Sequence, residues 1–160
     1  MCKFKVKWLF VIDDDYSWQS GLAISENADF YDKSGVKRLE IRQNGELKIL
    51  KGYAWDGCTP KFCLLDIVLG VPDGVVHERT KRPKTYYASL VHDALYQFLN
   101  DDLPLSRKDA DQCFLKLMQE SDFALSKLYY WAVRCFGNFF RRIAKRIRKT
   151  QGKKHVLAKP

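Results

Sequence analysis

The chain has 160 residues, of which 46% are hydrophobic, 14% aromatic and 29% charged. This composition excludes an intrinsically disordered or low-complexity protein and suits one ordinary domain with its own core. No apolar run approaches the roughly 18 residues needed to cross a bilayer, and only five apolar residues separate Lys7 from Asp13. We therefore expect neither a membrane-spanning segment nor a secretory signal peptide.

The first fifty residues are expected to be mainly β. Charged and apolar residues alternate from Lys3 and lead into an apolar run that ends at Ile12, which predicts a strand. Leu39–Arg42 and Glu46–Leu50 alternate in the same way on either side of Asn44-Gly45. An Asn-Gly pair between two alternating runs is typical of a β-hairpin.

From Tyr86 onward the apolar residues recur at steps of three and four, which predicts helices. The stripe of the first helix comprises Tyr87, Val91, Leu95 and Phe98. Ser106–Asp109 has the pattern of a capping box and predicts the start of a second helix. A third helix is expected from Ser126 to about Thr150. Its apolar stripe comprises Leu128, Ala132, Cys135, Phe136, Phe139, Ile143 and Ile147.

These elements together predict an α+β fold, in which an N-terminal antiparallel β region with a hairpin precedes two or three packed helices. We expect residues 1–137 to form a single α+β domain. Residues 138–160 are expected to form a basic amphipathic helical extension and tail, with a loose end from Gly152 to Pro160.

Positive charge is concentrated at the C-terminal end. The net charge is +9, and the sequence after Asp122 contains eleven of the 28 Lys and Arg residues but none of the 19 Asp and Glu residues. Such a local excess predicts an anionic partner, for which lipid headgroups, nucleic acid and an acidic protein are all candidates.

The five cysteines are irregularly spaced, and no two of them form a Cys-x-x-Cys pair. The chain has only three histidines, none beside a cysteine pair, so a structural zinc site is not expected. Without a secretory signal we expect most of the cysteines to be reduced thiols. They are Cys2, Cys58, Cys63, Cys113 and Cys135.

A candidate chemical site lies on the first two predicted helices. His92 and Tyr96 are four residues apart and share a helical face, with Asp93 beside them. Asp111 lies at the margin of the second helix's apolar stripe, where a carboxylate needs a partner. A His92–Asp111 bond would fix the imidazole tautomer and leave the other nitrogen as a general base.

A cation could lie next to this pair. Asp93 would point to the side of the helix, where it could contribute a carboxylate oxygen. The turn that contains Asp56, Gly57 and Thr59 could add backbone carbonyls, and this oxygen-rich set suits Ca²⁺ or another hard ion. The simpler alternative is that His92 and Asp111 form a helix cap or a satisfied surface pair without catalytic function.

Three separated blocks of the sequence resemble a family of uncharacterised proteins from bacteriophages and prophages. The blocks are Trp55–Pro60, Ser89–Tyr96 and Arg107–Phe114. The family pattern is Asp-Gly-small-Ser/Thr-x-Pro, His-Asp-x-Leu-Tyr and Arg-x-x-Ala-Asp-x-x-Phe. The resemblance implies a phage origin and supplies no activity.

The same blocks are also similar, more remotely, to the phospholipase A2 superfamily. There a Gly-Cys loop supplies carbonyl ligands to calcium, and a His-Asp-x-x-Tyr helix packs against an antiparallel helix whose Asp orients the histidine. The resemblance implies a phospholipase A2-like helical pair with His92 as the base and Asp93 as a calcium ligand. Asp111 would orient the histidine, Tyr96 would be a supporting hydrogen-bond donor, and residues 57–59 would supply carbonyl ligands.

The basic tail fits an interfacial helix that contacts anionic membrane lipid or an acidic protein. Its cations are Arg141, Arg142, Lys145, Arg146, Arg148 and Lys149, opposite Phe139, Phe140, Ile143 and Ile147. Nucleic acid is a weaker candidate because the aromatic residues gather on one face instead of alternating with the cations. Alternatively, the apolar stripe packs on the body and the charges are merely solvated.

Two functions from different classes therefore remain open. The first is a phage-encoded, metal-dependent lipid or ester hydrolase at a membrane surface. The second is a non-catalytic phage protein, either a virion or tail component or a protein that binds a host target, in which the polar cluster is a structural clasp. Either function implies a location in the host cytoplasm or in the virion.

Overall fold

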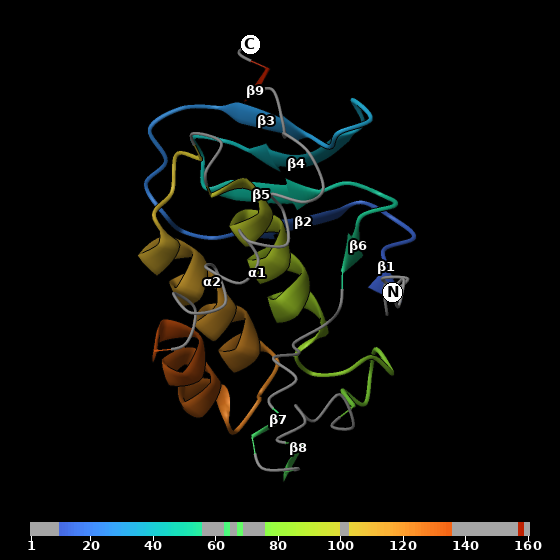
Figure 1. The fold of residues 1–160 in the computed structure, drawn as a ribbon, viewed down its shortest axis with the longest axis vertical. Helices are drawn as coiled ribbons and strands as arrows, with labels where there is room; N and C mark the ends of the chain where they lie inside the picture. The colour runs from blue at the N-terminus through green and yellow to red at the C-terminus, as the bar shows by residue number, and fades with distance from the viewer. Residues whose placement is uncertain are drawn as a thin grey trace, which may run out of the picture.

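The main sheet is antiparallel and lies at one end of the molecule (Figure 1). The computed structural model describes residues 10–55, 63–64, 67–68, 76–99, 103–135 and 157–158. Within these residues the sheet has five strands in the order β2-β5-β4-β3-β9. Their bounds are β2 Tyr16–Gln19, β3 Ala28–Tyr31, β4 Lys37–Ile41, β5 Glu46–Ile49 and β9 Leu157–Ala158.

The predicted hairpin is confirmed, because β4 and β5 pair across the Asn-Gly turn. Their alternating pattern places Leu39, Ile41, Leu47 and Ile49 in the core with no exposed surface. Gly45 has a φ of 86°, a left-handed conformation that favours glycine. The hairpin thus supplies the centre of the sheet's buried face.

Two short strand pairs accompany the main sheet. β1 (Phe10–Val11) pairs with β6 (Ala54–Trp55), so the end of the predicted Lys3–Ile12 strand is confirmed. Residues 3–9 of that prediction lie outside the described residues. β7 (Cys63–Leu64) and β8 (Ile67–Val68) form a separate antiparallel pair.

Helices α1 (Tyr86–Phe98) and α2 (Arg107–Glu120) pack against each other and lie on the same side of the main sheet (Figure 1). The rings of Phe30 on β3 and Phe98 on α1 lie 5.3 Å apart. Because α1 faces both the sheet and α2, its buried surface is wider than the predicted stripe and includes Leu90 and Ala94.

The predicted capping box begins α2. The Ser106 side chain accepts a hydrogen bond from the Asp109 backbone, and the Asp109 side chain accepts one from the Ser106 backbone. These two bonds satisfy backbone N–H groups that have no partner within the helix. The sequence signal and the structure therefore agree on where α2 starts.

A third helical segment covers residues 126–135 of the described chain. The stripe predicted for it is wrong at Leu128, whose surface is 64% exposed. Tyr129 and Val133 pack against the core instead, so the helix is rotated from the predicted orientation. None of the helices in the described residues is long and apolar enough to cross a membrane.

The order of elements confirms the predicted α+β class: antiparallel strands β1–β8 come first, helices follow, and β9 comes after them. The predicted loose end is wrong at Leu157–Ala158, because these residues pair with β3. The predicted domain boundary at 137 and most of the predicted extension lie outside the described residues.

Candidate functional site

The candidate site is centred on the carboxylate of Asp111, which α2 places in the interface with α1. Asp111 has no exposed surface. Its Oδ1 lies 3.1 Å from Nε2 of His92 and accepts a hydrogen bond from the Tyr96 hydroxyl at 2.5 Å. The two α1 side chains that the sequence places on one helical face therefore converge on one oxygen of the predicted acid.

The His92 imidazole is held by aromatic rings on both helices. Its centroid lies 4.1 Å from that of Tyr96 and 4.7 Å from that of Phe114 on α2. The His92 side chain keeps 12% of its surface exposed. Its Nδ1 lies 3.9 Å from Oδ1 of Asp93, which is beyond hydrogen-bond distance.

Two arginines contact this cluster, although no sequence argument had placed them there. Nη1 of Arg134 lies 3.0 Å from Oδ2 of Asp111, and Nε of Arg107 lies 3.7 Å from the same oxygen. Arg107 Nε also donates to the Tyr96 hydroxyl at 2.9 Å. We call His92, Tyr96, Arg107, Asp111 and Arg134 the Asp111 hub.

A local signal could have found one of these arginines. Arg107 precedes Asp111 by four residues on α2, the spacing at which opposite charges meet on one helical face. Arg134 comes from the third helical segment, 23 residues after Asp111, and has no such local signal. Its contact depends on how that segment packs.

The electrostatics of the hub favour an ionised carboxylate. Burial raises the pKa of Asp111, but the hydrogen bonds from His92, Tyr96 and Arg134 outweigh burial, and the net pKa is lowered. Burial and the bond to Asp111 both raise the pKa of Tyr96, so its phenol remains a proton donor. Asp111 is thus a permanent anion at neutral pH.

The same contacts raise the pKa of the His92 imidazole. Burial lowers the pKa of His92, but the carboxylates of Asp111 and Asp93 outweigh burial, and the net pKa is raised above 6.5. Because a carboxylate only accepts hydrogen bonds, the proton of neutral His92 lies on Nε2 and Nδ1 carries the lone pair. This arrangement can orient a histidine base.

Of the predicted metal ligands, only Asp93 lies in the described residues. Asp56, Gly57 and Thr59 lie outside them. In the described part of the chain, no three His, Cys, Asp or Glu side chains come together as a metal site would require. Of the side chains and carbonyls predicted to bind Ca²⁺, the structure therefore describes only the Asp93 carboxylate, beside His92.

Trp55, the residue that precedes the predicted calcium turn, is buried against α1. Trp55 is 1% exposed, and its Nε1 donates to Oγ of Ser89 at 3.1 Å. Ser89 precedes His92 by three residues and Asp93 by four, so all three lie on neighbouring turns of α1. The Trp55 side chain thus contacts α1 at a residue one helical turn before His92.

Two described cysteines carry free thiols. Cys113 on α2 is 2% exposed, and burial raises the pKa of its thiol to about 12, so it is an inert core residue. Cys135 is exposed. The six predicted lipid-contacting cations, from Arg141 to Lys149, lie outside the described residues.

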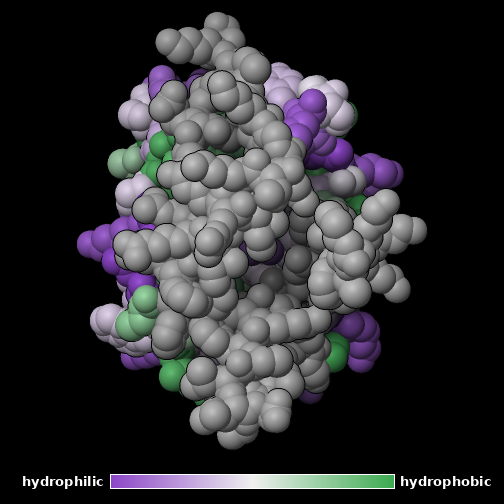
Figure 2. Space-filling model, in the orientation of Figure 1, coloured by the Kyte–Doolittle hydropathy of each residue, from purple (hydrophilic) through white to green (hydrophobic). Residues whose placement is uncertain are grey.

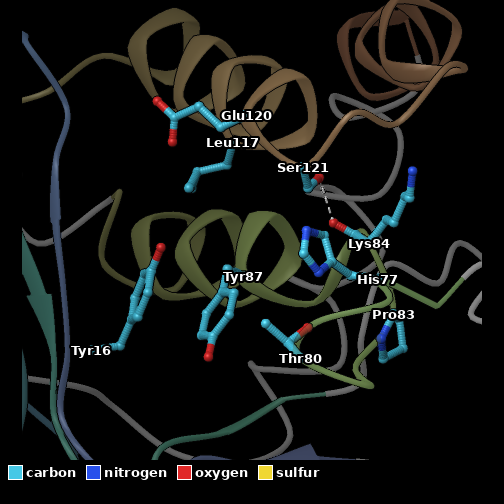
Figure 3. Close-up of a pocket in the computed structure, with 9 residues that line it drawn as sticks. All are labelled: Tyr16, His77, Thr80, Pro83, Lys84, Tyr87, Leu117, Glu120 and Ser121. Carbon is cyan, nitrogen blue, oxygen red and sulfur yellow. Dashed lines mark hydrogen bonds between the residues drawn. The ribbon is translucent and has the colours of Figure 1, made fainter.

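A separate pocket of about 180 Å³ is lined by side chains from β2, α1 and α2 and from the segment before α1 (Figure 3). Tyr16 of β2 and Tyr87 of α1 stack in its wall with centroids 4.3 Å apart. His77 and Glu120 also line it. None of the hub residues lines this pocket, so the two features are distinct.

Comparison with protein families identifies a relationship over the centre of the chain. A family model described as "Protein of unknown function (DUF1353)" matches residues 45–133, which is more than half of the 160 residues. The chain belongs to this family. The DUF1353 match includes β5, α1 and α2 and almost reaches Arg134, so it contains His92, Tyr96, Arg107 and Asp111. No curated protein and no solved structure matches the chain.

Proposed function

We propose that this DUF1353 protein is a phage-encoded, phospholipase A2-like hydrolase of a lipid or other carboxylic ester. The observation that supports this most is the 3.1 Å contact between Nε2 of His92 and the fully buried Asp111. A histidine oriented by a buried carboxylate is a recurrent device for activating a nucleophile. The three sequence blocks that contain Asp56, His92 and Asp111 follow one another in the same order as in the phospholipase A2 superfamily, which supports the same chemistry.

In the proposed reaction, Nδ1 of His92 accepts a proton from water as the water attacks the ester carbonyl. Asp111 stabilises the imidazolium that forms and holds the ring orientation. His92 then returns the proton to the leaving alkoxide. Tyr96 and Arg134 position Asp111 through their contacts with its carboxylate.

Ca²⁺ is the proposed cofactor. Asp93, with backbone carbonyls of residues 56–59, would hold it beside Nδ1 of His92, and bound Ca²⁺ would polarise the ester carbonyl. The proposed site of action is an anionic membrane surface in the host cytoplasm or virion. The tail cations from Arg141 to Lys149 would contact the lipid.

The test is hydrolysis of phosphatidylglycerol vesicles and of a soluble nitrophenyl ester, with calcium or with chelator. His92→Ala should reduce turnover by about 10²- to 10⁴-fold, as expected for loss of a general base. The matched control is His77→Ala, because His77 lies outside the Asp111 hub. Turnover that His92→Ala and His77→Ala leave equally intact would contradict the proposal.

The second candidate is a non-catalytic clasp in a virion component or a host-binding protein. The contacts of both Asp111 oxygens favour it, because Arg134 also links the third helical segment to α2. For a clasp, His92→Ala should lower the free energy of unfolding by about 1–3 kcal/mol, and no ester should be hydrolysed. Turnover in the wild-type protein that is lost in His92→Ala would exclude the clasp as the whole function.

A further inference from the structure

The helical segment over residues 126–135 is apolar on two faces. Its inner face carries Tyr129 and Val133, which pack against the core. The rings of Phe123 and Tyr129 meet edge to face with centroids 5.2 Å apart. Packing against the body therefore accounts for one face only.

The outer face carries three large hydrophobic side chains in contact with solvent. Leu125 is 47% exposed, Leu128 64% and Trp131 63%. Leu128 and Trp131 are three residues apart and share one side of the helix. Leu125 directly precedes the helix, and its carbonyl accepts a hydrogen bond from the Tyr129 backbone N–H. The other exposed large hydrophobics of the described chain, Val11, Val36 and Val76, are dispersed. We call Leu125, Leu128 and Trp131 the outer apolar face.

Hydrophobic surface is visible at the lower left of Figure 2, where the 126–135 helix lies in Figure 1. Hydrogen bonds connect the C-terminal end of this helix to α2. Arg107 Nη2 donates to the carbonyls of Val133 and Arg134 at 2.8 and 2.9 Å, and Arg134 pairs with Asp111. The outer apolar face is thus presented on a helix whose position is fixed by the hub.

Charge favours an anionic lipid surface over a second copy of the chain as the partner of this face. From Phe123 to the C-terminus the sequence has eleven Lys and Arg residues and no acidic residue. A second copy of the chain would bring two such segments together, which is electrostatically unfavourable. An anionic lipid surface attracts them, and tryptophan and leucine are suited to the boundary between headgroups and acyl chains.

We propose that the outer apolar face is a docking surface for anionic lipid membranes. Leu125, Leu128 and Trp131 insert at the headgroup boundary, while the basic residues that follow attract the bilayer. The inference rests on the proposed membrane partner and not on hydrolysis by His92. Because Arg134 joins the same helix to Asp111, docking would bring the Asp111 hub close to the lipid.

The test is co-sedimentation of the full chain with vesicles of phosphatidylcholine alone or mixed with phosphatidylglycerol. The variant is Leu128→Ser combined with Trp131→Ser. The matched control is Val36→Ser, because Val36 is 46% exposed in the turn between β3 and β4, away from this helix. We expect the double variant to bind the mixed vesicles about tenfold more weakly and the control to bind as the wild type does.

Circular dichroism and the thermal midpoint should be unchanged in the double variant, because both side chains are already exposed. Equal binding by the double variant and wild type would overturn the proposal. A wild-type dimer that the double variant converts to monomer, without a change in vesicle binding, would assign the face to a second copy instead. Vesicle binding by a wild-type protein that hydrolyses no ester would leave this inference standing.

Discussion

The Asp111→Asn substitution tests whether the hub is a dehydrated ionic cluster. Asp111 has no exposed surface and contacts His92, Tyr96 and Arg134 within 3.1 Å. The asparagine keeps the size of the side chain but removes the charge and presents an NH₂ group to these donors. Removing one partner of a buried ionic cluster costs about 3–5 kcal/mol.

We expect a loss near the lower end of that range, about 3 kcal/mol, because the Arg134 side chain is 32% exposed and can be hydrated. In a domain of this size, that loss lowers the thermal midpoint by roughly 6–12 °C. Urea unfolding followed by tryptophan fluorescence measures the free energy directly.

The matched control is Asp14→Asn, because Asp14 is an exposed carboxylate. It should change the free energy of unfolding by no more than about 0.5 kcal/mol. A loss below about 1 kcal/mol in Asp111→Asn, close to that of the control, would refute the interpretation that the Asp111 carboxylate is dehydrated and held by its partners.

Three further predictions concern His92, two glycines and a helix cap. Because the pKa of His92 is raised above 6.5, its ionic contribution to stability is complete below pH 6.5 and is lost as the pH rises through the folded-state pKa. The difference in unfolding free energy between wild type and His92→Gln should therefore shrink between pH 6 and 9 in urea titrations; a constant difference would contradict this. Gly45→Ala should cost more than Gly35→Ala in urea unfolding: both have positive φ, but a Cβ at Gly45 lies 3.3 Å from a backbone oxygen and one at Gly35 meets nothing within 4 Å. Equal losses would show that the neighbouring backbone moves aside. Ser106→Ala should lower the thermal midpoint through loss of about 1 kcal/mol of capping energy, whereas Ser106→Asp should retain most of it; an unchanged midpoint in the alanine variant would argue against the cap.

Local patterns in the sequence predicted the elements that depend on neighbouring residues. The hairpin at Asn44-Gly45 and the capping box at Ser106 are confirmed because turn geometry and helix capping are set within four residues. The first helix was placed from its 3.6-residue periodicity. Strands β2 and β3 had no comparable local signal, and sheet pairing defines them.

The candidate site was predictable in part for the same reason. The sequence placed His92 and Tyr96 on one face, and the cost of an unpaired carboxylate suggested Asp111 as their partner. The contact between them required the two helices to face each other, which the structure provides. The catalytic role of these residues remains a prediction.

Only the tertiary structure decided which face of the third helical segment packs against the core and that its Arg134 contacts Asp111. Its apolar residues cover more than one face, so periodicity alone could not choose between Leu128 and the pair Tyr129 and Val133 as the packed side. Packing against the core chose the latter. The same rotation carries Arg134 to Asp111, a contact over 23 residues that no local pattern encodes. The sequence by itself determined which groups need a partner, because burial and charge are properties of residue type, whereas the choice of partner depends on how the elements pack in space.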